Sequence, residues 1–165
     1  MATPGAPRPI DARGWIFEVQ DLTAASTETW LRVGLLTSFS HSPGENEETE
    51  DITTFDDDGH YSQDIMQRGA SISLESKYAA DKTGARDPGQ AYVDEKWVPR
   101  LGAESHNPVR WRHRTQTAWV VWDATVSPGE QGGGTTEKTS WSATITRCGK
   151  PSTTAVTPPP AGGGS

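Results

Sequence analysis

The most chemically distinctive segment of this 165-residue chain is a run of carboxylates with no Lys or Arg among them. Its eight acids are Glu45, Glu47, Glu48, Glu50, Asp51, Asp56, Asp57 and Asp58. Calcium could bind their oxygens, but the spacing lacks the alternating Asp register and the closing Glu of an EF-hand loop. Glycoside hydrolysis would need one carboxyl in a partly apolar pocket, which consecutive solvated acids on a loop seldom provide. A mobile solvated loop is the simplest interpretation for the isolated chain.

Two apolar residues, Ile52 and Phe55, interrupt the acidic run. The run lies in an expected loop over residues 41–64, and a loop of more than about 20 residues inside a compact domain is usually functional. We therefore expect this acidic loop to become ordered against a partner.

A second candidate surface is an arginine strip formed by Arg110, Arg112 and Arg114. Because side chains alternate between the faces of a strand, all three guanidinium groups are expected on one face of a strand over residues 108–114. Three interpretations stay open: nucleic-acid recognition, a plain solvated face, and head-to-tail self-association in which the acidic loop of one copy meets the strip of another. A contact of the last kind builds rings or open stacks.

Motifs for enzyme chemistry are absent from the sequence, which has no phosphate-binding loop, HExxH, CxxC or GxSxG. The four His are scattered; two could meet as metal ligands, but surface or half-buried His is much the commoner case. Cys148 is the only cysteine, nothing in the sequence places a base beside it, and we expect a small structural role for it. We therefore predict no catalytic residue, no metal and no cofactor, and a protein that is not an enzyme.

Composition and charge predict one soluble domain. Hydrophobic residues make up 32% of the chain and there are seven Trp, so the apolar material is concentrated in a few large side chains. No apolar run approaches the roughly 20 residues of a membrane helix, and the Pro-rich segment Met1–Pro9 has no apolar signal region, so synthesis in the cytoplasm is expected. A net charge of -7 repels polyanions and argues against tight nucleic-acid binding.

Alternation of apolar and polar residues predicts a mainly β fold. The expected strands cover residues 14–20, 29–40, 70–78, 108–114, 117–127 and 141–146. In the second of these, one face is expected to carry Leu31, Val33, Leu35 and Phe39. The segment 117–127 is apolar on both faces, so we place it at the centre of the sheet. The Gly-rich stretch 128–134 after it supplies the turn of a hairpin.

One helix is predicted, over about residues 88–98. Its signals are an N-cap residue, a first-position Pro, a capping-box residue and apolar residues four apart: Asp87, Pro88, Gln90, then Val93, Trp97 and Leu101. A helix this short is stable only when it is packed, so Val93 and Trp97 are expected to contact the sheet.

Composition divides the chain into three parts. Residues 1–12 and 149–165 are rich in Pro, Gly, Ser and Thr with almost no large apolar side chain, which predicts a flexible N-terminal arm and a flexible C-terminal tail. Residues 13–148 form the predicted β domain, which carries the helix and the acidic loop.

This layout resembles the major tail tube protein of long-tailed bacteriophages, particularly the non-contractile, lambda-like (siphovirus) type. The segments that carry the resemblance are LLTSFSHSPGE, the acidic loop through DITTFDDD, RGASISLESKY, DPGQAYVDEKW and TSWSATITRCGKPS. The resemblance implies a β-sandwich or half-barrel flanked by a helix. It also implies rings of six subunits stacked into a tube that carries DNA, with the loop at residues 41–64 reaching a neighbouring ring.

The function implied by this resemblance is that of a structural virion component of the tail tube, made in the host bacterial cytoplasm. Its partners would be copies of itself, the tape measure protein, the tail terminator and tail-tip proteins, while viral DNA passes without specific binding. Six copies at -7 each would carry about -42, a field that keeps DNA from sticking. The alternatives are a phage tail terminator or head-completion protein, a carbohydrate-binding β-sandwich module with exposed Trp, and a hydrolase using the carboxylates of residues 45–58.

Overall fold

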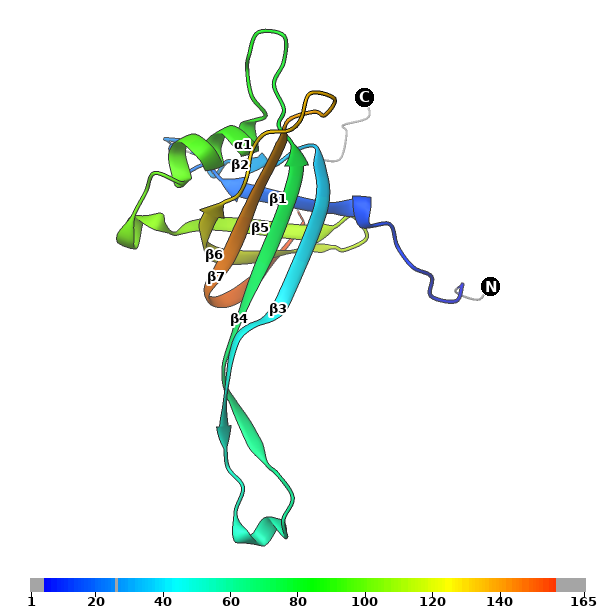
Figure 1. Cartoon of the computed structure of the whole chain (residues 1–165), viewed down its shortest axis with the longest axis vertical. Helices are drawn as coiled ribbons and strands as arrows, with labels where there is room; N and C mark the ends of the chain where they lie inside the picture. Colours follow the sequence, from blue (N-terminus) through cyan, green and yellow to red (C-terminus); the bar gives the residue numbers. More distant parts are fainter. Residues whose placement is uncertain (1–4, 26, 157–165) are drawn as a thin grey trace, which may run out of the picture.

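Seven strands form one sheet in the structure, a computed structural model that describes residues 5–25 and 27–156. The strands are β1 (Trp15–Gln20), β2 (Trp30–Arg32), β3 (Leu36–Asp51), β4 (Gln63–Lys77), β5 (Asn107–His113), β6 (Ala118–Pro128) and β7 (Ser140–Ala155). The helical elements are η1 (Ala12–Gly14), η2 (Phe55–Asp57), α1 (Pro88–Tyr92), η3 (Val93–Trp97) and η4 (Gly102–Ser105). All strand pairs are antiparallel, and the sheet order is β2-β1-β5-β6-β7-β4-β3 (Figure 1).

The sheet curls on itself, so that its two halves face each other across the core (Figure 1). Trp15 of β1 stacks on Phe39 of β3 with ring centroids 4.9 Å apart, although β1 and β3 lie near opposite ends of the sheet order. Phe39 also contacts Trp111 of β5 at 5.8 Å between centroids. The fold is therefore a mainly β half-barrel with one short helix against it, which confirms the predicted fold class.

The core occupies the inner face of this curled sheet. Alternate residues of β4, β5 and β7 are buried there, as the sequence pattern predicts: Ile72, Leu74, Val109, Trp111, Trp141, Ala143 and Ile145. β6 is the fourth of the seven strands, which confirms the central position predicted for segment 117–127. It buries both Trp119 and Trp122, and truncating either of these rings to Ala would cost about 3–5 kcal/mol.

The helix begins where the sequence predicts. Asp87 caps it, because its Oδ2 accepts a hydrogen bond from the Gln90 backbone N–H at 3.2 Å, and Pro88 takes the first helical position. The second half of the helix, η3, is a π-helix that ends at Trp97. Val93 and Trp97 both lie buried in the core, so the helix covers one side of the sheet.

Two details of the predicted helix are wrong. Gln90 does not close a capping box, because its side-chain nitrogen donates to Ser76 Oγ and to the Lys77 carbonyl oxygen, each at 2.9 Å. Through these hydrogen bonds the Gln90 side chain instead links the helix to the end of β4. Leu101 lies beyond the helix and is 81% exposed, because Pro99 has no N–H with which to continue the helical hydrogen bonds.

The segment 29–40 forms two strands instead of the single strand predicted. β2 pairs with β1 and β3 pairs with β4, so the chain crosses between the two ends of the sheet order through residues 33–35. Asp87 at the helix N-terminus holds this crossing, since its Oδ2 accepts from the Gly34 N–H at 3.1 Å. Leu35 has a φ of 55° and is 61% exposed, so it leaves the apolar face on which the pattern places it.

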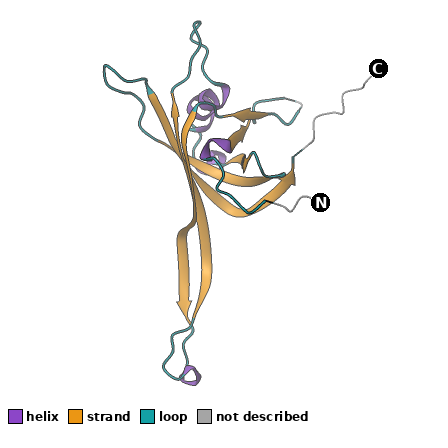
Figure 2. Cartoon of the chain, turned by 90° about the vertical axis from the view of Figure 1, so that its right-hand side faces the viewer, coloured by secondary structure: helices purple, strands orange, loops and turns teal. Residues whose placement is uncertain are grey.

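The loop predicted over residues 41–64 is instead a long β-hairpin. β3 and β4 continue beyond the body of the sheet as a two-stranded ribbon, and only residues 52–62 connect them (Figure 2). We call residues 43–68 the arm. Its strands escape detection by alternation because neither of its faces is buried.

The ends of the β domain also differ from the prediction. β7 runs on to Ala155, so residues 149–155 of the expected tail belong to the sheet. Residues 5–11 contain no helix or strand. The other parts of the two segments predicted to be flexible, residues 1–4 and 157–165, lie outside the described residues.

Candidate assembly site

The arm projects from one end of the body as a separate two-stranded ribbon (Figures 1 and 2). Its pairing runs from Glu45 opposite Gly69 to Asp51 opposite Gln63, with register shifts where it leaves the sheet. At about 3.3 Å per residue, the strand from Pro43 to Asp51 is roughly 30 Å long. An isolated two-stranded ribbon is only marginally stable in water, so contact with another molecule would stabilise an arm of this length.

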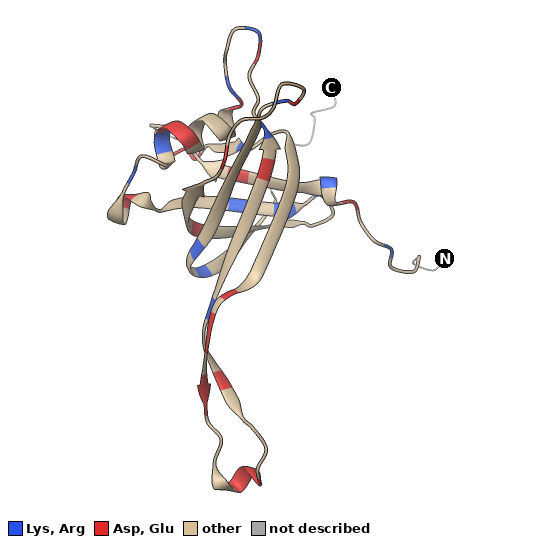
Figure 3. Ribbon diagram, viewed as in Figure 1, with Lys and Arg blue, Asp and Glu red and all other residues tan. Residues whose placement is uncertain are grey.

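The acidic residues predicted to take part in assembly all lie on the arm (Figure 3). Asp57 is half-buried, and the exposed ones are Glu45, Glu47, Glu48, Glu50, Asp51, Asp56 and Asp58. Arg68 is the only Lys or Arg of the arm, and its Nε lies 3.0 Å from Glu47 Oε2. The arm therefore carries a large excess of negative charge.

The tip of the arm is a structured turn. Asp57 Oδ2 accepts a hydrogen bond from the Thr54 backbone N–H at 2.7 Å, and the pair forms a capping box around η2. Asp58 follows with a left-handed backbone, φ 49°. Asp51 Oδ1 accepts a hydrogen bond from the Thr53 backbone N–H at 2.9 Å, and the side chain and then the backbone N–H of Thr53 lower the pKa of this carboxyl. The turn is thus held in one shape by its own polar groups.

Large apolar side chains are exposed along this acidic arm. Of the nine large apolar residues that are exposed in the described part of the chain, five lie on the arm: Ile52, Phe55, Tyr61, Ile65 and Met66. Phe55, at the tip, is fully exposed. A rigid, outward-pointing aromatic side chain is typical of an interface anchor. The last three of these residues are missed by sequence reasoning, because Tyr61 lies in the connection between the strands and the arm half of β4, with Ile65 and Met66, has no regular alternation.

The root of the arm is held by an aromatic cluster. His41 of β3 packs against Trp111 and Trp122, with ring centroids 4.6 and 5.4 Å away. His41 is an exposed residue, but partial burial of its ring, and secondly the positive charge of Arg147, lowers its pKa. The arm therefore leaves the body from a fixed position.

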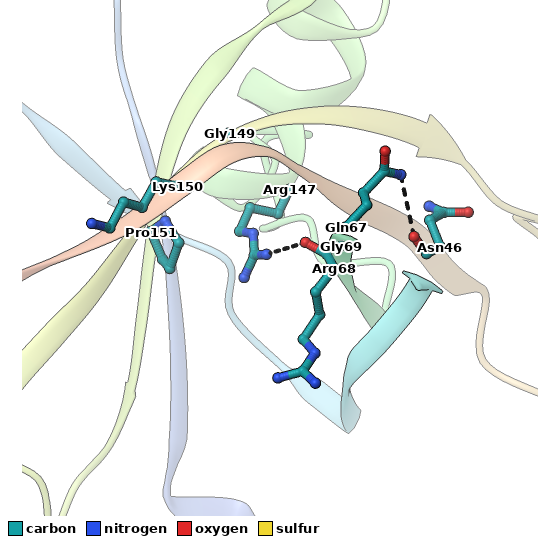
Figure 4. A pocket seen from close by; sticks show the side chains of 8 residues that line it. All are labelled: Asn46, Gln67, Arg68, Gly69, Arg147, Gly149, Lys150 and Pro151. Atoms are coloured by element: carbon teal, nitrogen blue, oxygen red, sulfur yellow. Dashed lines mark hydrogen bonds between the residues drawn. The ribbon is translucent and has the colours of Figure 1, made fainter. Parts of the chain in front are cut away.

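A shallow hollow of about 500 Å³ lies beside this root (Figure 4). Arg68, Arg147 and Lys150 line it, but two of these cations are engaged within the chain. Arg147 donates to the Arg68 carbonyl oxygen at 2.9 Å, and Arg68 pairs with Glu47. The hollow is a polar, partly neutralised surface, and sequence reasoning misses it because three strands contribute to it.

Arg110 of the arginine strip is not available to a partner. Its Nη2 lies 2.6 Å from Glu18 Oε2 of β1, and its guanidinium is clamped between the rings of Trp30 and Trp119. The side chain is only 22% exposed. This arginine therefore stabilises the outer face of the sheet.

The other two arginines of the strip differ from each other. Arg112 lies over the same face as Arg110, 4.8 Å from the Trp119 ring, and its Nη1 donates to the Gln116 carbonyl oxygen at 3.2 Å. Arg114 lies beyond the end of β5 and is exposed. Among the described residues no salt bridge includes Arg114. Of the predicted strip, Arg114 is thus the member best placed to meet an acidic partner.

The described residues lack the features of several other functions. Among residues 5–25 and 27–156, no three His, Cys, Asp or Glu side chains converge as metal ligands would. Within those same ranges, every helix is too short or too polar to span a bilayer. Trp15 and Trp30 are half-buried and the other five Trp are buried, so they do not form the exposed stacking platforms of a carbohydrate-binding module.

Comparison with known proteins gives structural matches. No family model and no curated protein matches the sequence. A chain in the virion of a native gene transfer agent (GTA) particle matches with a TM-score of 0.61 and 16% identity, over 89% of this chain and 100% of that one. A chain in the tail of an empty GTA particle with C6 symmetry matches with a TM-score of 0.61 and 18% identity, again over 89% of this chain and 100% of that one. The anti-feeding prophage cap, a tube terminating cap, matches with a TM-score of 0.53 and 13% identity, over 94% of this chain and 97% of that one.

The fold is that of tail tube proteins. The comparisons thereby confirm the part of the sequence resemblance that concerns the fold. Within this tail tube fold, the arm and Arg114 are both exposed, and Arg114 takes part in no salt bridge of the described residues.

Proposed function

We propose that this chain is a structural subunit of a tail tube, which assembles with copies of itself and transforms no substrate. The observation that carries the proposal is the arm, a ribbon about 30 Å long that exposes both carboxylates and large apolar side chains. Apolar groups on a projecting element are removed from water only by another molecule. The likeness in fold to chains from gene transfer agent virions and tails supports the same role.

The proposed assembly is a stack of hexameric rings in the virion tail of a long-tailed bacteriophage or a related particle. A structural neighbour from a tail with C6 symmetry supports six-fold order. Lateral pairing within a ring would cover sheet edges that a lone subunit exposes. The arm then makes a head-to-tail contact with a copy in the next ring, and such a contact repeats into an open stack.

The acidic charge suits a tube that conducts DNA. A ring of six copies at -7 each carries about -42, and such a field repels phosphates. DNA would pass through the lumen without binding. The tape measure protein inside the tube, and the terminator and tip proteins at its ends, would be the other partners.

Negative-stain electron microscopy of the concentrated protein tests the proposed function. We expect rings or hollow tubes of uniform width. Observing only monomers at every salt concentration and in crowding agents would contradict the proposal. The sedimentation of the same samples gives the fraction assembled.

A terminating cap is the second candidate, since one structural neighbour is the anti-feeding prophage cap. A cap forms one ring and stops a tube, whereas a tube subunit stacks repeatedly. Tubes of many rings grown from this chain alone favour the tube subunit. The cap is favoured if the chain forms single rings that never stack and if the particle holds only enough copies for one ring.

A further inference from the structure

We infer that the tip of the arm docks into an apolar hollow on a second copy of this chain, beside η1 and flanked by Arg13 and Arg114. This inference rests on the proposed self-assembly and names the two surfaces that meet. On one side are Phe55 and the carboxylates next to it. On the other side are the residues around the start of β1 and the end of β5.

The tip has the properties of a preformed ligand. Phe55 is fully exposed, and the capping box between Thr54 and Asp57 fixes the turn that presents it. The Asp57 carboxylate is engaged in this capping box, whereas the carboxylates of Asp56 and Asp58 are exposed and can bind a partner. A fixed turn loses little conformational entropy on binding, so the burial of one aromatic ring can contribute most of its free energy.

The hollow beside η1 suits an aromatic side chain. It measures about 380 Å³ and is lined mainly by apolar surface, including Pro9 and Ile10, and Ile10 is 58% exposed. Its floor is the buried His113 ring, which is fixed at both nitrogens: Nε2 donates to the Asp11 carbonyl oxygen at 2.7 Å, and Nδ1 lies 2.9 Å from Thr115 Oγ1. The floor therefore does not need to rearrange to receive a ring.

Two positive charges flank this hollow. Arg13 and Arg114 both line it, both are exposed, and no salt bridge of the described residues includes either. Asp11 also lines it, so its carboxylate offsets part of this charge. The balance is still positive on a molecule whose net charge is -7, and it complements Asp56 and Asp58.

The hollow at the root of the arm is a poorer receptor for the same tip. Its Arg68 and Arg147 are already engaged, and the Glu47 carboxylate beside Arg68 would repel an incoming Asp. The lining there is more polar than that of the η1 hollow, so it suits the Phe55 ring less well. A tip that fills the η1 hollow must come from a second copy, because Figures 1 and 2 both show the tip far from η1 in the same chain.

Disulfide trapping tests this inference. In a Cys148→Ser background, Asp56→Cys is combined with Thr115→Cys beside the η1 hollow, or with Lys150→Cys beside the root hollow. Mild oxidation should give ladders of cross-linked chains only with the Thr115→Cys pair, and a reducing agent should dissolve them. Tubes that form without this ladder, or with the ladder only in the Lys150→Cys pair, overturn the inference but leave the proposed function intact. A protein that forms no tubes and no ladder contradicts both.

Phe55→Ala tests the aromatic anchor separately. We expect the concentration needed for assembly to rise at least about tenfold, because the interface loses its main apolar contact. Leu101→Ala is the matched control, since Leu101 is also highly exposed but lies away from the arm. Both residues are exposed, so circular dichroism should show an unchanged fold in each variant. Assembly of Phe55→Ala at the concentration of the unmodified chain would overturn the assignment of the tip.

Discussion

At the scale of single residues, Arg110 shows how neighbours can remove a charge from a binding surface. Its guanidinium carbon lies 4.4 Å from the Trp30 ring centroid and 4.3 Å from that of Trp119, and Glu18 accepts its hydrogen bond at 2.7 Å. Arg110→Ala would leave the half-buried Glu18 carboxylate without its partner. We expect the free energy of unfolding to fall by about 1–3 kcal/mol, measured by urea denaturation.

Arg114→Ala is the matched control for this substitution. Arg114 is exposed and lies outside β5, so its removal should change the free energy of unfolding by no more than about 0.5 kcal/mol. Equal effects of the Arg110→Ala and Arg114→Ala substitutions on stability would contradict the different roles assigned to them.

The arm and Arg110 show which features of a site can be predicted from the sequence and which cannot. All but Asp57 of the predicted acids of the arm are exposed, as a run of like charges predicts, because burying an unpaired carboxylate would remove its hydration at a high cost in free energy. The environment of Arg110 could not be predicted, since Glu18 is 92 residues away in the chain and reaches it only through the pairing of β1 with β5. A strand pattern gives the face of a side chain but not its neighbours on other strands.

At the scale of elements, the root of the arm should respond to pH. Packing on Trp111 and Trp122, and then the charge of Arg147, lowers the pKa of His41 below its ordinary value of 6.5. The unfolded chain therefore binds this proton more readily than the folded chain, so stability is lost as the pH falls from about 6.5 through the lower folded pKa. His41→Phe keeps an aromatic ring without the proton. Urea midpoints between about pH 7.5 and pH 5 should fall more steeply for the unmodified chain than for His41→Phe; equal slopes would contradict this.

The arm as a whole should be dispensable for folding and required for assembly. Replacing residues 43–68 by Asn-Gly leaves a four-residue connection, Asn-Gly followed by Gly69 and Ala70, between the paired residues Ser42 and Ser71. Residues 43–51 are all exposed, so little buried surface is lost and the urea midpoint should stay nearly unchanged. The tubes seen by negative stain should disappear. A shortened chain that still forms tubes would show that the arm has no part in stacking.

Alternation located the strands of the body but not the arm. Buried residues such as Ile72 and Leu74 repeat every second position, because one face of β4 meets the core. β3 from Ser40 to Asp51 is exposed on both faces, so its sequence has no alternation of apolar and polar residues and predicts an acidic loop. The split at residues 33–35 was equally hidden, since it depends on a hydrogen bond from Gly34 to the helix cap.

At the scale of the whole molecule, the distribution of charge should decide how assembled tubes treat DNA. The chain has a net charge of -7, and the basic patch around Arg13 and Arg114 would be covered by the tip of a neighbour. Six copies per ring would then present a net charge of about -42. Short duplex DNA mixed with tubes at low salt should therefore stay in the supernatant when the tubes are pelleted.

Low salt makes this test stringent, because screening is weak and any attraction between DNA and the tube would be strongest there. A charge-reversed chain, with Glu45, Glu47 and Glu48 replaced by Lys, serves as the positive control, since it gains cations and loses acids on the arm. If its tubes form, they should pellet part of the DNA, and the amount should fall as salt is added. DNA that pellets with the unmodified tubes at physiological salt would contradict an anionic conduit and would favour a nucleic-acid-binding role for the exposed arginines.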